Sequence, residues 1–316
     1  MENRSVRALA ISPGHWSPGQ SADLTPVRAT SGWGGLGSCE FCVVIPARNE
    51  AKRIGRCLES VDHATHDLGA APREVVVVDD YSSDGTAAVA ARPGVTVVRQ
   101  PEHLGRLAAW SRGVAESTAP VVVFVDADCE VRSDAFRLLL TAFAEPRVGV
   151  AAARSVLRPA QSRGVPERAA RFSAVILHEI KSQLSNHDFL PIGRLMAVRR
   201  DAWAVTDSSL APCDRLVAHL AKLRGWEIAY LPAAEVLYQP VSTYGALRED
   251  YFRTGARRRP TVAACDPLPP EVMVRALWIG MRRSPADAAA WLSCRFLLGA
   301  ERVLGFGRGR TRPAVR

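Results

Sequence analysis

Lysine is scarce in this 316-residue chain, and long apolar runs are missing. Only Lys52, Lys181 and Lys222 are lysines, so 38 of the 41 basic residues are arginines. An arginine-rich composition can reflect a GC-rich coding sequence, which reduces the functional weight of the net charge of +9. No apolar run reaches the ~18 residues that a membrane-spanning helix needs. Residues 1–37 lack the continuous apolar core of a secretory signal, so we expect a cytoplasmic protein.

Cysteine gives no sign of a disulfide framework. The seven cysteines are an odd number, scattered along a chain that is long enough to fold without cross-links. We therefore expect reduced thiols. Cys39 and Cys42 form a single C-x-x-C pair with no second pair after it, which favours burial in a strand over zinc or redox chemistry.

Two common nucleotide-binding loops are also missing. The first predicted strand runs into Pro46–Glu50 (PARNE), which has no glycine and cannot form the G-x-G-x-x-G turn of a dinucleotide site. No G-x-x-x-x-G-K-[ST] sequence is present, which excludes a P-loop. The glycines at 305–309 follow no predicted strand, so we assign them to the tail.

Short apolar runs alternate with helical patterns in the first half of the chain. The runs predict strands at 41–45, 74–78, 95–98 and 120–125, and the helical patterns lie at 54–61, 86–91 and 104–115. Wholly apolar strands that alternate with helices are typical of a parallel sheet covered on both faces, so we predict an α/β fold. After residue 150 the alternation ends, and the patterns predict helices at 166–184 and 214–223 and strands at 190–198 and 228–231.

Composition divides the chain into three predicted parts. Residues 1–38 are rich in Gly, Pro, Ser and Thr and predict a disordered leader, although Trp16 and Trp33 could dock on the domain. Residues 39–243 contain the α/β domain. Residues 244–316 form a basic amphipathic helical extension, and from residue 248 onward it holds 14 arginines against 6 acidic residues.

Carboxylates gather where two predicted strands end. Asp79, Asp80 and Asp84 follow the second strand, and Asp126 and Asp128 follow the fourth. In open parallel sheets, ligands bind outside the carboxyl ends of the strands. A helix N-cap explains Asp84 but not the adjacent pair before it, whose oxygens can accept hydrogen bonds from a ribose or a base. The second group predicts a site of hard oxygen ligands for Mg²⁺ or Mn²⁺ on nucleotide phosphates.

Three segments together resemble the family 2 glycosyltransferases of the GT-A fold. They are Val43–Glu50 (VVIPARNE), Val75–Thr86 (VVVVDDYSSDGT) and Val123–Asp128 (VFVDAD). The resemblance implies a mostly parallel central sheet with helices on both faces. It implies a hexosyltransferase that inverts the anomeric carbon as it moves a sugar from a nucleotide-diphosphate donor to an acceptor hydroxyl or other nucleophile. A UDP-sugar is the favoured donor, and a divalent cation, Mg²⁺ or Mn²⁺, is the implied cofactor.

The resemblance also implies roles for individual residues. Those expected to bind the nucleotide sugar are Pro46, Ala47, Asn49, Glu50, Asp79, Asp80, Arg106, Asp126, Ala127 and Asp128. Asp80 is expected to hold the base with Asp79 beside it. Asp126 and Asp128 form the D-x-D motif and are the expected metal ligands. Arg106 matches a Gly-Lys/Arg element that usually precedes the fourth strand.

Asp214 is the expected general base. The family places an acceptor-side Glu-Asp pair after a glycine-containing strand, which matches residues 193–200 (GRLMAVRR), and here the pair reads Cys213-Asp214. The alternative role of Asp214 is that of a helix N-cap. Glu179 and Asp188 are the next candidates for the base. The missing Glu leaves open a catalytically inactive protein that binds nucleotide sugars.

The arginine-rich extension has functional and purely structural interpretations. Arg253 and Arg257 are candidates for contacts with the donor diphosphate or the acceptor, and a solvated basic face is the alternative. Basic amphipathic helices at 272–298 fit either an anionic membrane surface or packing on the domain. Membrane contact predicts a peripheral protein on the inner face, and the expected acceptor is lipid-linked or a small metabolite.

Two further classes of protein are weighed against this interpretation. The chain has no tryptophan of the Q-x-x-R-W type found in synthase-like family members, which argues against processive polymer synthesis. A protein that binds nucleic acid through these arginines is an alternative. The sequence has no recognisable nucleic-acid-binding module, so we expect no specific nucleic acid partner.

Overall fold

The computed structural model describes residues 40–159, 164–184, 193–205, 214–240, 243–249 and 269–303. The predicted leader at 1–38 lies outside these residues. So do Cys213, Arg253, Arg257 and Asp188, and the predictions for them stay predictions.

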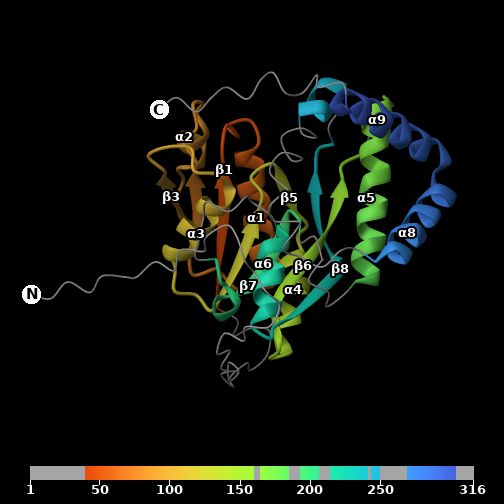
Figure 1. Ribbon diagram of the computed structural model, residues 1–316. Coiled ribbons are helices and arrows are strands. Elements are labelled where there is room, and N and C mark those ends of the chain that lie inside the picture. Colours follow the sequence, from red (N-terminus) through yellow and green to blue (C-terminus); the bar gives the residue numbers. More distant parts are fainter. Residues whose placement is uncertain are drawn as a thin grey trace, which may run out of the picture.

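Eight strands of the described chain form one mixed sheet (Figure 1). In chain order they are β1 (Phe41–Ala47), β2 (Val75–Asp79), β3 (Val95–Arg99), β4 (Val121–Val125), β5 (Cys129–Val131), β6 (Val148–Leu157), β7 (Leu195–Arg199) and β8 (Glu227–Tyr238). Their order across the sheet is β3-β2-β1-β4-β7-β6-β8-β5. The pairs β1–β2, β1–β4, β2–β3 and β6–β8 are parallel, whereas β4–β7, β6–β7 and β5–β8 are antiparallel.

The predicted α/β class is confirmed, and the sheet is more mixed in its second half than in its first. Strands β5 and β6 were not predicted from the sequence. Strand β6 carries the run Ala151–Arg154, and alanine has a low strand propensity, so its sequence gives little strand signal. Its burial between β7 and β8 in the sheet overrides that weak local preference.

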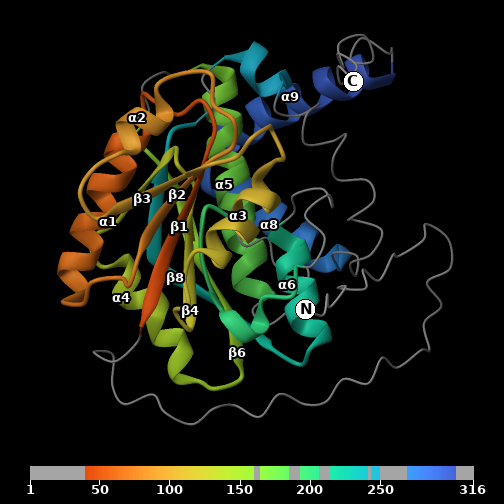
Figure 2. The ribbon, with the colours of Figure 1, turned by 90° about the vertical axis from the view of Figure 1, so that its left-hand side faces the viewer.

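Helices cover both faces of this sheet (Figure 2). They are α1 (Ile54–Leu68), α2 (Thr86–Ala90), α3 (Arg106–Ala115), α4 (Ala135–Leu140), α5 (Val165–Gln183), α6 (Asp214–Leu223), α8 (Pro270–Arg283) and α9 (Pro285–Val303). Every residue of β1, β2 and β4 is buried, as expected for strands between two helical layers.

The alternation of side chains along β1 divides the core into two main clusters. Phe41, Val43 and Ile45 pack with α1 and α4, whereas Cys42 and Val44 face the cluster that includes α3, α5 and α6. Cys42 is a buried free thiol, in agreement with the prediction of burial in a strand.

The C-terminal helices α8 and α9 pack against α5 at one side of the molecule (Figure 1). A Cβ atom at Gly280 of α8 would lie 2.9 Å from the ring of Phe172, so glycine permits the close approach to α5. The Trp291 ring of α9 lies 5.5 Å from the same phenylalanine ring, and Arg168 pairs with Asp287 at 3.1 Å. One face of the extension therefore packs on the domain. Among the described helices, none combines the length and apolarity needed to cross a bilayer.

Candidate functional site

An arginine links the two acidic groups that the sequence assigned to donor and acceptor. Arg106 is the first residue of α3, and its Nη1 lies 3.5 Å from Oδ2 of Asp126, directly after β4. Its Nη2 lies 3.0 Å from Oδ1 of Asp214, the first residue of α6. The fold thus brings the end of β4 and the start of α6 together around one guanidinium group.

Asp214 is held from two sides. While Oδ1 contacts Arg106, Oδ2 accepts a hydrogen bond from the N–H of Gly193 at 3.0 Å. Gly193 has a φ of 86°, and a Cβ atom there would lie 3.1 Å from Nζ of Lys181. The carboxylate of Asp214 therefore bonds to groups outside α6. A role as helix N-cap alone does not account for these two contacts.

Negative charge is concentrated at this edge of the sheet. Burial raises the pKa of Asp126 to about 6; Arg106 opposes this shift, and Asp128 and Asp214 add to it. Burial also raises the pKa of Glu50 to about 7, where Arg53 opposes the shift and Asp128 adds to it. These carboxylates are near enough to influence one another, so a cation would relieve their repulsion.

The acidic pair after β4 fits a Mg²⁺ or Mn²⁺ site of the type completed by substrate. Within the described part of the chain, no group of three or more His, Cys, Asp or Glu side chains forms a closed metal cage. Mg²⁺ is commonly held by one or two carboxylates, with phosphate oxygens and water completing the shell. Asp126 and Asp128 supply that number of hard oxygen ligands.

The first and second motifs are joined by hydrogen bonds. Asn49, at a φ of 57°, donates its N–H to Oγ of Ser82 at 3.0 Å, and its Oδ1 accepts the N–H of Ser83 at 2.9 Å. The N–H of Glu50 donates to Oγ1 of Thr86 at 2.7 Å. These contacts fix the turn after β1 against the turn after β2. Pro46 and Ala47 lie buried at the end of β1.

Asp80 has a structural role that the sequence did not indicate. Its carboxylate accepts the N–H groups of Leu104 at 2.8 Å and Gly105 at 3.0 Å. Nδ1 of His103 lies 2.7 Å from its Oδ2. Asp80 therefore holds the loop that leads into α3 and Arg106. His103 has no local sequence signal, because its partner lies 23 positions earlier.

Asp79 is fully buried beside this loop. Its Oδ1 accepts the N–H of Ser82 at 3.1 Å, and Nε of Arg99 lies 3.4 Å from its Oδ2. Ser82 belongs to the turn after β2, and Arg99 is the last residue of β3. Asp79 thus stabilises the turn on which its neighbour Asp80 stands.

Three further residues near the site were missed by sequence reasoning. Lys181 of α5 is 1% exposed, with Nζ 3.4 Å from the carbonyl oxygen of Ala153. Burial lowers the pKa of Lys181 to about 7, and Asp214 opposes this shift. The guanidinium of Arg194 lies 3.7 Å from the ring centroid of Tyr238. The scarcity of lysine is the single sequence feature that marks Lys181.

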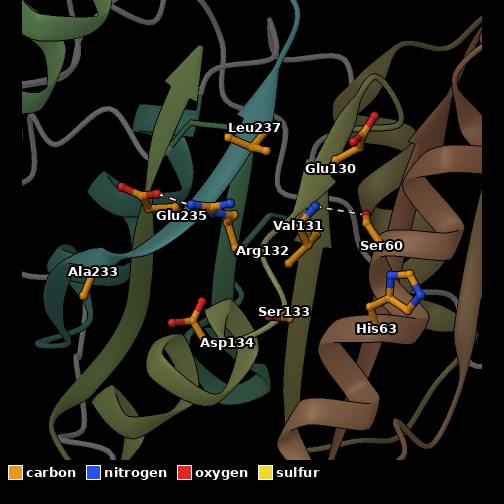
Figure 3. Close-up of a pocket in the computed structure, with 10 residues that line it drawn as sticks. All are labelled: Ser60, His63, Glu130, Val131, Arg132, Ser133, Asp134, Ala233, Glu235 and Leu237. Carbon is orange, nitrogen blue, oxygen red and sulfur yellow. Dashed lines mark hydrogen bonds and ion pairs between the residues drawn. The ribbon is translucent and has the colours of Figure 1, made fainter. Parts of the chain in front are cut away.

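A separate hollow of about 580 Å³ lies between α1, β5 and β8 (Figure 3). Oγ of Ser60 on α1 accepts the N–H of Val131 at 2.9 Å, and Nε of Arg132 lies 3.7 Å from Oε2 of Glu235. The hollow is lined by none of the residues predicted to bind the nucleotide sugar.

Residues 42–205 match the family model "Glycosyl transferase family 2". The chain belongs to this family. The matched range contains all three motifs, Arg106 and both carboxylates after β4, and it ends before α6. The resemblance seen in the sequence is thereby confirmed, and residues 42–205 form a glycosyltransferase family 2 domain.

Two curated relatives agree with this assignment. The glycosyltransferase AglE of Haloferax volcanii is 35% identical over 92 residues, which are 28% of this chain and 30% of the relative. The 4,4'-diaponeurosporenoate glycosyltransferase of Staphylococcus aureus is 36% identical over 107 residues, which are 32% of this chain and 27% of the relative. The matched stretch thus spans less than a third of either relative.

The fold is shared with a mannosyltransferase. The structure of PcManGT from Pyrobaculum calidifontis in complex with GDP-Man and Mn²⁺ superposes with a TM-score of 0.56 at 21% identity. The similarity covers 87% of this chain and 81% of that one. This likeness confirms the predicted GT-A fold.

Proposed function

We propose that this glycosyltransferase moves a hexosyl group from a nucleoside diphosphate sugar to an acceptor hydroxyl, or to another nucleophile, in one inverting displacement. The observation that carries the proposal is the Arg106 bridge between Asp126 and Asp214. One guanidinium group contacts both Asp126, which we expect to face the donor, and Asp214, which we expect to face the acceptor.

Asp214 is the general base in this proposal. Its carboxylate accepts the proton of the acceptor hydroxyl while the oxygen attacks the anomeric carbon. The N–H of Gly193 and the guanidinium of Arg106 fix the orientation of the carboxylate. One displacement inverts the anomeric carbon and needs no covalent sugar–enzyme intermediate, so a second nucleophilic carboxylate is not required.

Asp126 and Asp128 would hold the divalent cation, Mg²⁺ or Mn²⁺, and through it the donor diphosphate. When bound, the cation neutralises charge on the leaving diphosphate. Arg106 adds a positive charge on the same side of the site and turns from its carboxylate partners toward the diphosphate. The Mn²⁺ in the PcManGT complex supports a cation here without deciding between the two metals.

The nucleotide pocket lies over the ends of β1 and β2, lined by Pro46, Ala47, Asn49 and Glu50. We keep a UDP-sugar as the proposed donor, with Asp80 and Asp79 shaping the base pocket through the loop at 103–105. The similar mannosyltransferase was solved with GDP-Man, so the base is the first property to test. The proposed acceptor is lipid-linked or a small metabolite.

A panel of nucleotide sugars tests the proposal. The full chain is heated with each UDP- or GDP-sugar, with and without Mn²⁺, since specific ligands raise apparent stability by mass action. We expect the largest rise in Tm with a UDP-sugar and Mn²⁺ together. Stabilisation that is independent of any cation contradicts the metal role. Donor binding without donor hydrolysis or transfer to any acceptor favours the inactive alternative.

A further inference from the structure

The helices α8 and α9 carry an exposed apolar surface that the proposed chemistry does not use. We call it the outer face, and it consists of Val274, Trp278, Met281, Leu292, Phe296 and Leu297, which are 44–76% exposed. Eleven large apolar residues are exposed in the described chain, and six of them belong to this face. Exposed apolar side chains are normally scattered singly over a protein surface, so such clustering marks an interaction site.

Helical periodicity places the exposed residues of α8 opposite its packed side. On α8 the residues Val274, Trp278 and Met281 follow the spacing of one helix face, while Val272 and Ala276 on the other side are buried. On α9, Leu292, Phe296 and Leu297 are exposed, and Ala288, Cys294 and Leu298 are buried.

Both helices pack on α5 (Figure 1), and the exposed apolar side chains lie on the part of their surface that this packing leaves open. An amphipathic helix that only packs on a domain has one apolar stripe. Each of these helices also carries exposed apolar side chains, which packing on α5 does not explain.

The charge around the outer face is positive. Arg275, Arg282 and Arg295 are exposed on the two helices. Arg282 lies 4.6 Å from the ring centroid of Trp278, which places a cation beside an exposed aromatic ring. Between residues 270 and 298 the exposed acidic residue is Glu271, because Asp287 is turned inward to Arg168 and Arg171.

We propose that the outer face docks on an anionic lipid bilayer, with α8 and α9 lying in the plane of the interface. Tryptophan, phenylalanine and leucine on one side of a helix enter the boundary between headgroups and acyl chains, and neighbouring arginines bind anionic headgroups. Charge complementarity favours this partner over a neutral one. The docking residues lie outside the proposed donor site, so membrane docking can be tested independently of the proposed chemistry.

Co-sedimentation with vesicles tests the docking. The full chain is mixed with vesicles of phosphatidylcholine alone or with a third of phosphatidylglycerol. We expect binding to the anionic vesicles that weakens with added salt, because salt screens exposed charges. In Arg275→Gln/Arg282→Gln, binding should fall by roughly fivefold for each arginine. In Trp278→Ser/Phe296→Ser, it should fall by at least about tenfold.

A matched control distinguishes docking through the outer face from non-specific binding by exposed apolar side chains. Val89→Ser/Leu223→Ser removes two exposed apolar side chains of similar exposure on α2 and α6, and it should bind vesicles as the parent chain does. All variants should keep the parent Tm, since the changed side chains are exposed.

Two results overturn the proposal. One is the absence of binding to anionic vesicles by the parent chain. The other is a self-association, seen by analytical ultracentrifugation, that Trp278→Ser/Phe296→Ser abolishes while vesicle binding is unchanged. That second result assigns the outer face to a second copy of the chain.

Discussion

Replacing Asp214 by asparagine tests the catalytic assignment most directly, and the structure changes what the sequence predicted for it. From the sequence alone, the variant should keep its Tm, because asparagine caps a helix about as well as aspartate. In the structure both carboxylate oxygens accept hydrogen bonds, one from Arg106 and one from Gly193. Asparagine has one acceptor oxygen, so its NH₂ group must face one of these two donors.

The expected cost to stability is small compared with the expected cost to catalysis. A hydrogen bond to a charged group contributes about 1.5–3 kcal/mol. The Arg106 side chain is 36% exposed, so solvent screening brings the loss to the lower end, about 1–2 kcal/mol. For a domain of this size each kcal/mol lowers the Tm by roughly 2–4 °C. Loss of a general base lowers the transfer rate by at least about 100-fold.

These two effects can be separated quantitatively. Native proteins have about 5–15 kcal/mol of stability, so a loss of about 2 kcal/mol leaves nearly all of the protein folded at 25 °C. Unfolding therefore cannot mimic a 100-fold loss of transfer. The assay measures transfer of a labelled sugar beside urea unfolding of the same preparation.

The control is Glu167→Gln. Glu167 is a fully buried carboxylate on α5, paired with Arg171 at 3.3 Å, so its loss should lower the Tm without affecting transfer. Near-normal transfer by Asp214→Asn with a verified acceptor refutes the assignment and moves the base to Glu179 or Asp188. Of these two, Glu179 is engaged by Arg283 of α8 at 2.6 Å.

Three further predictions follow from the site. Asp128→Asn should keep the fold but lose the Mn²⁺-dependent rise in Tm and most of the transfer; full parent activity after exhaustive chelation contradicts the metal role. Asp80→Ala should weaken nucleotide binding by roughly 1–3 kcal/mol in calorimetry and also lower the Tm, since the loop at 103–105 loses its acceptor. Lys181→Met should stabilise the chain more at pH 6.5 than at pH 9.5 in urea unfolding; an equal gain at both pH values contradicts the burial argument.

The sign of the Lys181 effect follows from its pKa. The folded-state pKa is about 7, below the ordinary value of 10.5, so between these values the unfolded chain binds more protons than the folded one. The contribution of Lys181 to the free energy of unfolding of the parent chain therefore rises with pH from about 7 to 10. The charged lysine is penalised in full below pH 7, where its removal is most favourable.

Local patterns were sufficient to predict where the first strands end and where the carboxylates gather. Continuous apolar runs marked β1, β2 and β4, and the carboxylates that follow them lie at one edge of the sheet, as the topology of parallel strands requires. The contacts made across the fold were not predictable. The bonds of Asp80 to the loop at 103–105 and of Arg106 to Asp214 depend on how α3 and α6 pack on the sheet.

The family match covers only some of the features described above. The family match ends at residue 205, before α6, so it includes the three motifs that the proposal assigns to the donor. Asp214 and the outer face of α8 and α9 lie beyond the match, whereas the contact of Lys181 with Ala153 of β6 lies within it. In the proposed inverting displacement the acceptor must approach the sugar from the side opposite the leaving diphosphate. The residues that select the acceptor are therefore to be sought from α5 onward, and a membrane-docked α8–α9 pair favours acceptors presented at a lipid surface.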